Sequence, residues 1–296
     1  MKLIPSAATL LLTGLIWTCL ASARIPAEPI AAGSSQFVFG TGKEAITVFT
    51  HKPDHYAGGP LLMVMHGMNR NAEDYRNYAI TLATRLKVIV AAPHFDKDRF
   101  STAAYNRGGI IDDAGQPQPR EQWTYTTVLR IVEDIRTREG KPDLAYSFIG
   151  HSGGGQFLVR LAAFSPGAAT RIVAANPGSL LFPRRDWNFG YGFGGLPEEL
   201  SNEATLRRYL AAPLTLNLGT ADIDPNHDVL DKSKDAMLQG NFRLERGRAC
   251  YEFARKLAAE KGWPFHWRKV ETEGIGHDGE KMFAAPEATE ALTGTK

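Results

Sequence analysis

Short apolar segments alternate with amphipathic segments along most of this chain. The apolar segments are five or six residues long and bounded by Gly, Pro or Asp, which is typical of buried strands; they lie at 45–49, 61–65, 88–92, 145–149, 171–175, 214–218 and 265–270. Apolar residues recurring every three or four positions predict helices between them, for example at 72–86, 121–138, 155–164 and 246–261. This alternation predicts an α/β fold: a mostly parallel sheet with helices on both faces.

Two segments, 94–120 and 176–200, follow neither periodicity and are interpreted as loops over a site. The second is rich in glycine and aromatic residues, among them Trp187 and Tyr191. Long ordered loops on α/β scaffolds often bind substrate. The alternative is a packed surface excursion, and the pattern leaves both open.

The N-terminus differs from the rest of the chain. Lys2 precedes an uncharged apolar run at 7–20, which ends in Ala21-Ser22-Ala23. This is the pattern of a secretory signal peptide cleaved after Ala23, and it predicts a secreted or periplasmic protein. A membrane anchor is the alternative, but it needs about 20 apolar residues, and this run is shorter. We expect a signal peptide at 1–23 and a single catalytic α/β domain at 24–296, with no membrane anchor after cleavage.

Composition narrows the possible partners. The 34 Lys and Arg residues nearly balance the 32 Asp and Glu residues, so a nucleic-acid partner is not indicated. Beyond residue 23 the only cysteine is Cys250, which excludes an internal disulfide in the mature chain. No HExxH motif, CxxC pair or His/Asp cluster at ligand spacing occurs, so no metal centre is expected. The oligomeric state is not indicated.

The central motif is Gly150-His151-Ser152-Gly153-Gly154. It follows the strand-like segment 145–149 and precedes the helical pattern. A serine between strand and helix is held on a tight turn with its hydroxyl exposed, and the flanking glycines avoid collisions with neighbouring backbone. The motif predicts Ser152 as a nucleophile.

A serine hydroxyl becomes nucleophilic when a histidine takes its proton and an acid orients that histidine. After the strand at 214–218 comes Asp222, and the glycine-framed His277 follows later, in the order nucleophile, acid, base. We therefore predict Asp222 as the acid and His277 as the base. Asp224 is the alternative acid, and either aspartate could simply cap the turn.

The reaction also needs two backbone N–H groups that stabilise an oxyanion. One belongs to the residue after the nucleophile, Gly153. The second is expected from Met68, because Gly67 lets the loop after the strand at 61–65 turn its amides toward the site.

Together these motifs resemble the α/β-hydrolase superfamily, and within it the secreted esterase and depolymerase branch with polyhydroxybutyrate depolymerases and feruloyl esterases. The resemblance spans about residues 45–285. It implies a serine hydrolase that cleaves small or polymeric esters, or amides, through an acyl-serine and without a cofactor. The chain lacks the extra disulfides and the polymer-binding module that depolymerases of this branch often carry.

A narrower resemblance is to bacterial poly(aspartic acid) hydrolases. It implies an anionic substrate, which Arg184 and Arg185 could attract together with Arg243, Arg246 and Arg248. The alternative is that these arginines are ordinary surface and helix-terminal charges. A peptidase or acyltransferase on the same fold, and a non-catalytic binding protein, are the competing functions.

Overall fold

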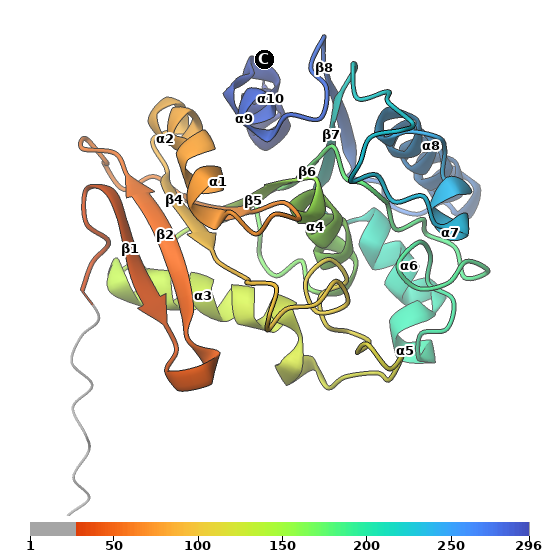
Figure 1. Cartoon of the computed structure of the whole chain (residues 1–296), viewed down its shortest axis with the longest axis horizontal. Coiled ribbons are helices and arrows are strands. Elements are labelled where there is room, and N and C mark those ends of the chain that lie inside the picture. Colours follow the sequence, from red (N-terminus) through yellow and green to blue (C-terminus); the bar gives the residue numbers. More distant parts are fainter. Residues whose placement is uncertain (1–27, 296) are drawn as a thin grey trace, which may run out of the picture.

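A computed structural model describes residues 28–295 and contains one eight-stranded sheet in the order β1-β2-β4-β3-β5-β6-β7-β8 (Figure 1). The strands are β1 (Gly33–Phe39), β2 (Ile46–Lys52), β3 (Leu61–Met65), β4 (Ile89–Pro93), β5 (Tyr146–His151), β6 (Ile172–Ala175), β7 (Leu214–Gly219) and β8 (Arg268–Thr272). From β4 to β8 neighbouring strands are parallel, whereas β2 pairs antiparallel with β1 and β4. The expected α/β fold is confirmed. The signal peptide predicted at 1–23 lies outside the described residues.

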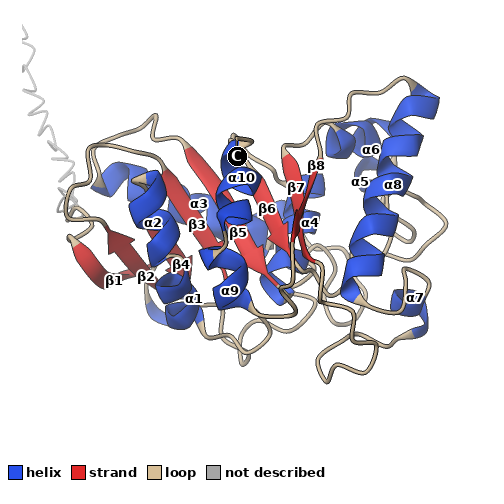
Figure 2. Cartoon of the chain, turned by 90° about the horizontal axis from the view of Figure 1, so that it is seen from above, coloured by secondary structure: helices blue, strands red, loops and turns tan. Residues whose placement is uncertain are grey.

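Helices cover both faces of the sheet (Figure 2). One face carries α1 (Ala72–Tyr78), α2 (Ile80–Leu86), α9 (Gly279–Ala284) and α10 (Pro286–Thr293). The other carries α3 (Thr124–Arg138), α4 (Gly153–Phe164), α6 (Glu203–Leu210) and α8 (Arg243–Lys261), with the short α5 (Glu198–Ser201) and α7 (Lys234–Met237) at its margin.

The buried strand β3 shows how the sequence creates two cores. All five of its residues are buried. Because side chains alternate across a strand, Leu62 and Val64 join the cluster under α1, α2, α9 and α10, whereas Met63 joins the cluster under the opposite helices. A strand with both faces covered therefore needs a continuous apolar run rather than an alternating one.

Three elements differ from the predictions. The single helix expected at 72–86 is divided at Ala79 into α1 and α2. The strand expected at 265–270 begins only at Arg268. Strand β1 was not predicted, because it lies at the sheet edge and none of its side chains is fully buried.

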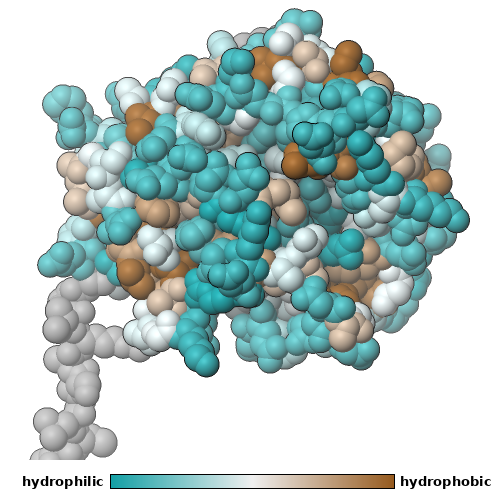
Figure 3. All heavy atoms as spheres, viewed as in Figure 1, coloured by the Kyte–Doolittle hydropathy of each residue, from teal (hydrophilic) through white to brown (hydrophobic). Residues whose placement is uncertain are grey.

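Polar side chains dominate the surface view of the molecule. The face shown in Figure 3 is mostly hydrophilic, with scattered hydrophobic side chains, which is ordinary for a globular protein. Within residues 28–295, no helix combines the length and apolarity needed to cross a bilayer. Cys250 is buried.

Candidate active site

Ser152 lies at the sharp turn between β5 and α4. Its backbone has φ 57° and ψ −115°, a conformation that non-glycine residues rarely adopt and that projects the side chain away from both elements. Gly154 is required beside it, since a Cβ there would lie 2.1 Å from the carbonyl oxygen of Met65 on β3. The glycines therefore let α4 start directly against β3.

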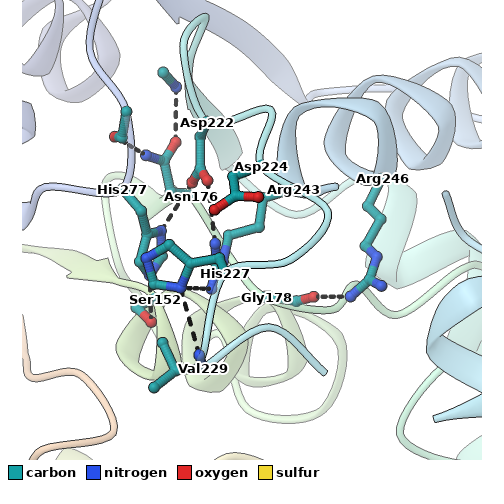
Figure 4. A network of polar contacts seen from close by, with 12 residues as sticks. Ser152, Asn176, Gly178, Asp222, Asp224, His227, Val229, Arg243, Arg246 and His277 are labelled. Atoms are coloured by element: carbon teal, nitrogen blue, oxygen red, sulfur yellow. Dashed lines mark hydrogen bonds and ion pairs between the residues drawn. The ribbon is translucent and has the colours of Figure 1, made fainter. Parts of the chain in front are cut away.

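Three side chains from separate loops meet at this turn (Figure 4). The Oγ of Ser152 lies 3.0 Å from Nε2 of His277, and Nδ1 of His277 lies 2.8 Å from Oδ2 of Asp222. Asp222 follows β7 and His277 follows β8, so the parallel strands deliver all three residues to the same edge of the sheet. Since the carboxylate can only accept, Nδ1 of His277 carries the proton and Nε2 faces the serine hydroxyl.

The electrostatics favour a neutral His277. Burial lowers its pKa, the hydrogen bond to Asp222 raises it, and the cation of Arg243 lowers it further. The net direction is downward, so the ring is unprotonated at neutral pH and Nε2 can accept a proton.

The two candidate acids have different surroundings. Asp222 is buried, with its side chain 2% exposed, and contacts His277 and Arg243. Asp224 is exposed and accepts a hydrogen bond of 2.8 Å from the backbone N–H of Asn226. The structure thus brings Asp222 to His277 and leaves Asp224 as a turn residue.

Met68 and Gly153 place their backbone amides close together beside Ser152. A Cβ on Gly153 would lie 3.2 Å from the backbone nitrogen of Met68. Within residues 28–295, neither of these two N–H groups donates a hydrogen bond to a protein acceptor. Two unsatisfied donors at a nucleophile are the arrangement that stabilises an oxyanion.

Residues of the loop at 94–120 hold the backbone that leads to Met68. Nδ1 of His66 lies 3.0 Å from the carbonyl oxygen of Gly67, and Nε2 accepts the N–H of Phe95 at 3.1 Å. Burial lowers the pKa of His66 to about 3, so this histidine stays neutral. Tyr105 donates to the carbonyl of His66 at 2.7 Å, which fixes the backbone leading into the oxyanion loop.

Asn176 is a positioning residue that the sequence did not reveal. Its Oδ1 accepts the N–H of Gly219 at 2.7 Å, and its Nδ2 donates to the carbonyl of Gly276 at 2.9 Å. Gly219 ends β7 before Asp222, and Gly276 directly precedes His277. One amide side chain therefore joins the acid turn to the histidine loop, and a lone asparagine after a strand carries no sequence signal for that role.

A cleft of about 340 Å³ opens over Ser152 and His277. Met68 and Tyr78 contribute to one wall, and His227, Asp228 and Val229, from the long loop after β7, contribute to another. Asp228 is the only charged side chain among the residues lining it; neither lysine nor arginine lines it. The lining therefore presents no lysine or arginine to an anionic ligand.

The residues proposed from sequence to bind substrate, Trp187, Tyr191, Arg184 and Arg185, do not line this cleft. Arg184 pairs with Asp186 and stacks on Trp187 at 4.3 Å. Arg185 pairs with Glu198 at 2.5 Å, and the Tyr191 hydroxyl donates to Asp231 at 2.6 Å. Their contacts lie within the protein, and a role in substrate binding stays a prediction.

The other three arginines expected to attract an anionic substrate also have partners within the protein. Arg248 pairs with Glu271 at 2.6 Å, and Arg243 is buried against Asp222 at 3.1 Å. Arg246 is buried and donates to the carbonyls of Gly178 at 2.6 Å and Asp231 at 2.8 Å.

A second buried arginine holds the aromatic-rich loop in place. Arg160 on α4 donates to the Ser179 hydroxyl at 3.1 Å and to the carbonyl of Gly190. Arg160 thus anchors the loop at 176–200 to α4, while Arg246 anchors both this loop and the loop after β7 to α8.

The site residues carry no metal-binding arrangement in the described part of the chain: no group of three or more His, Cys, Asp or Glu side chains is placed to hold an ion there. The chemistry that the residues themselves offer is proton transfer between Ser152 and His277 beside two backbone donors.

Comparison with known proteins shows which folds and families the chain resembles. No protein-family model and no curated protein matches the chain. Among solved structures, poly(aspartic acid) hydrolase-1 from Sphingomonas sp. KT-1 is 33% identical, with a TM-score of 0.82 over 88% of this chain and 98% of that one. The poly(3-hydroxybutyrate) depolymerase LpqC from Bordetella parapertussis is 34% identical, with a TM-score of 0.80 over 87% of this chain and 90% of that one.

The fold and these similarities define an α/β hydrolase. More narrowly, the chain belongs to the esterase and depolymerase family that includes poly(aspartic acid) hydrolase-1 and LpqC. The siderophore hydrolase EstB from Aspergillus nidulans, at 17% identity and a TM-score of 0.52 over 90% of this chain and 96% of that one, shares the fold.

Proposed function

We propose that this protein is a serine esterase in which Ser152 is the nucleophile, His277 the general base and Asp222 the acid that orients it. The observation that carries the proposal is the chain of contacts from Ser152 Oγ to His277 at 3.0 Å and on to Asp222 at 2.8 Å, beside two unengaged backbone N–H groups.

This geometry supports the following reaction. Nε2 of His277 takes the hydroxyl proton as Oγ of Ser152 attacks the ester carbonyl carbon, and the amides of Met68 and Gly153 bind the resulting oxyanion. His277 then gives the proton to the departing alcohol, leaving an acyl-serine. Water attacks the acyl-serine with His277 again acting as base, which releases the acid and restores Ser152. These steps need no cofactor.

The lining of the cleft supports a neutral ester as substrate. An anionic polymer would approach Asp228 without an opposing cation in the lining. LpqC is named for a neutral polyester, and its similarity therefore agrees with this choice of substrate class.

A second candidate is hydrolysis of an amide in poly(aspartic acid), because poly(aspartic acid) hydrolase-1 is equally similar in sequence and fold. For that substrate the arginines outside the cleft, such as Arg185, would have to exchange their present partners for the polymer.

We also propose that the protein is exported and that residues 1–23 are removed. The uncharged run at 7–20 and the small residues before position 24 support this proposal. N-terminal sequencing of the protein recovered outside the cytoplasm is expected to begin at Arg24, and an intact N-terminus there would refute cleavage.

The decisive experiment compares the mature chain with its Ser152→Ala variant on nitrophenyl acetate, polyhydroxybutyrate, a feruloyl ester and poly(aspartic acid). We expect release from neutral esters, and a loss of several orders of magnitude in the variant with an unchanged circular dichroism spectrum. Mass spectrometry after rapid quenching should find the acyl group on Ser152. Activity retained by the variant would refute the mechanism, and turnover of poly(aspartic acid) alone would select the second candidate.

A further inference from the structure

Arg243 connects the catalytic acid to a histidine in the cleft. Its Nη1 donates to Oδ1 of Asp222 at 3.1 Å, and its Nη2 lies 3.4 Å from Nδ1 of His227 (Figure 4). The Arg243 side chain is 1% exposed, so the guanidinium is fixed between these two partners. His227 is therefore held by the same group that holds Asp222.

The contacts of His227 determine which of its ring nitrogens carries the proton. Besides Arg243, the backbone N–H of Val229 lies 3.4 Å from Nδ1. A guanidinium and a backbone N–H can only donate, so Nδ1 must accept. The ring proton is then on Nε2, and this nitrogen has no hydrogen-bond partner within residues 28–295.

His227 lies in the cleft next to His277. The residue lines the cleft with Ser152, and its ring packs against the His277 ring at 5.0 Å between centroids, tilted by 76°. Met68 and Gly153 face the carbonyl oxygen under attack, whereas His277 faces the departing alcohol. His227 thus lines the cleft next to the residue that hands the proton to the departing alcohol.

We propose, on the basis of the esterase function above, that His227 is a specificity-determining residue. Its Nε2–H donates to a carbonyl oxygen in the alcohol part of the substrate, beside the ester being cleaved. Asp228 on the same wall disfavours a free carboxylate there, so the preferred group is an uncharged carbonyl, as in an ester of a hydroxy acid whose own carboxyl is blocked. Arg243 is the positioning residue that fixes the acceptor role of Nδ1.

Two substrates that differ only in this carbonyl test the proposal. The alcohol part of sec-butyl acetate contains no carbonyl group. In methyl 3-acetoxybutyrate the terminal methyl of that alcohol part is replaced by a methyl ester. Acetate release reports cleavage of the same bond in both. We expect the wild-type protein to have a higher kcat/KM for methyl 3-acetoxybutyrate, and the ratio of the two values measures the preference.

Two variants separate the donor from the shape of the side chain. His227→Asn places its amide near the position of Nδ1 and removes the donor at Nε2, whereas His227→Gln can present an amide N–H near the position of Nε2. We expect His227→Asn to lower the preference ratio about five- to tenfold, which is the effect of losing one neutral hydrogen bond. His227→Gln is expected to keep most of the wild-type ratio. Because both substrates are measured on one preparation, a partly unfolded variant does not alter the ratio.

The outcomes distinguish this proposal from the one it rests on. A ratio that stays unchanged in His227→Asn, or equal losses on both substrates in both variants, overturns the role of His227. Acetate release that persists in Ser152→Ala overturns the esterase mechanism instead. If Ser152→Ala is inactive and the ratio does not respond to His227, only the specificity proposal fails.

Discussion

Replacing Arg243 with methionine tests the buried support of the catalytic acid. The substitution keeps much of the side-chain volume but removes the guanidinium 3.1 Å from Asp222, in a pair whose side chains are 1% and 2% exposed. Removing one partner of a buried ion pair leaves the other charge uncompensated and typically costs about 3–5 kcal/mol. We therefore expect Arg243→Met to lower the free energy of unfolding by that amount.

The same substitution has a second, independent effect on catalysis. The pKa of His277 is lowered mainly by burial and further by the cation of Arg243. Without that cation the pKa of His277 rises. Because His277 must be unprotonated to accept the serine proton, the acidic limb of the kcat/KM profile should move to higher pH.

Urea unfolding at pH 7.5 and the pH dependence of nitrophenyl acetate hydrolysis measure the two effects. Arg255→Met is the matched control, since its pair with Glu252 is 52% and 45% exposed and should contribute less than about 1 kcal/mol. The reasoning is refuted if Arg243→Met is no more destabilising than Arg255→Met, or if the acidic limb stays in place or moves to lower pH.

Three further predictions concern other parts of the site. Asp222→Asn should reduce kcat on nitrophenyl acetate by about 10⁴-fold and Asp224→Asn by less than about twofold; equal losses would show that the acid is wrongly assigned. Gly154→Ala should lower both the melting temperature and the rate, because its methyl would lie 2.1 Å from the Met65 carbonyl oxygen; a variant with wild-type values would contradict the close packing of α4 on β3. The pKa of His66 is about 3 in the fold and about 6.5 in an unfolded chain, so the unfolded state binds more protons between these values and stability falls as pH decreases through them. From pH 6.5 to 5 this contribution is about 2 kcal/mol, and urea midpoints of His66→Gln should lack it; an unchanged pH slope would speak against a neutral His66.

The central strands and the turn at Ser152 could be predicted from sequence because their determinants are local. Strand β3 is buried on both faces and is an uninterrupted apolar run, and the turn before α4 needs its glycines at fixed positions. The edge strand β1 has no such signature, since solvent tolerates almost any residue on its exposed positions. The apolar periodicity at 72–86 likewise does not indicate the break between α1 and α2 at Ala79.

The wall of the cleft formed by residues 227–229 could not be predicted from sequence, because these residues lie in a loop without periodicity. His227 stands in no sequence motif, yet the loop after β7 brings it to the cleft beside His277. Arg243 was expected among the arginines that attract an anionic substrate, although on helix α8 it is buried and pairs with Asp222. Which of several arginines is buried depends on contacts between distant segments, which no single stretch of sequence contains.

The loop at 176–200 and the loop after β7 are held in place by hydrogen bonds from arginine side chains rather than by a disulfide. Arg246 joins the backbone carbonyls of Gly178 and Asp231, and Arg160 joins helix α4 to Gly190, while Cys250, the one cysteine among the described residues, is buried and unpaired. Bonds from a guanidinium to carbonyl oxygens are indifferent to oxidation and reduction. The order of these loops is consequently the same under reducing and under oxidising conditions.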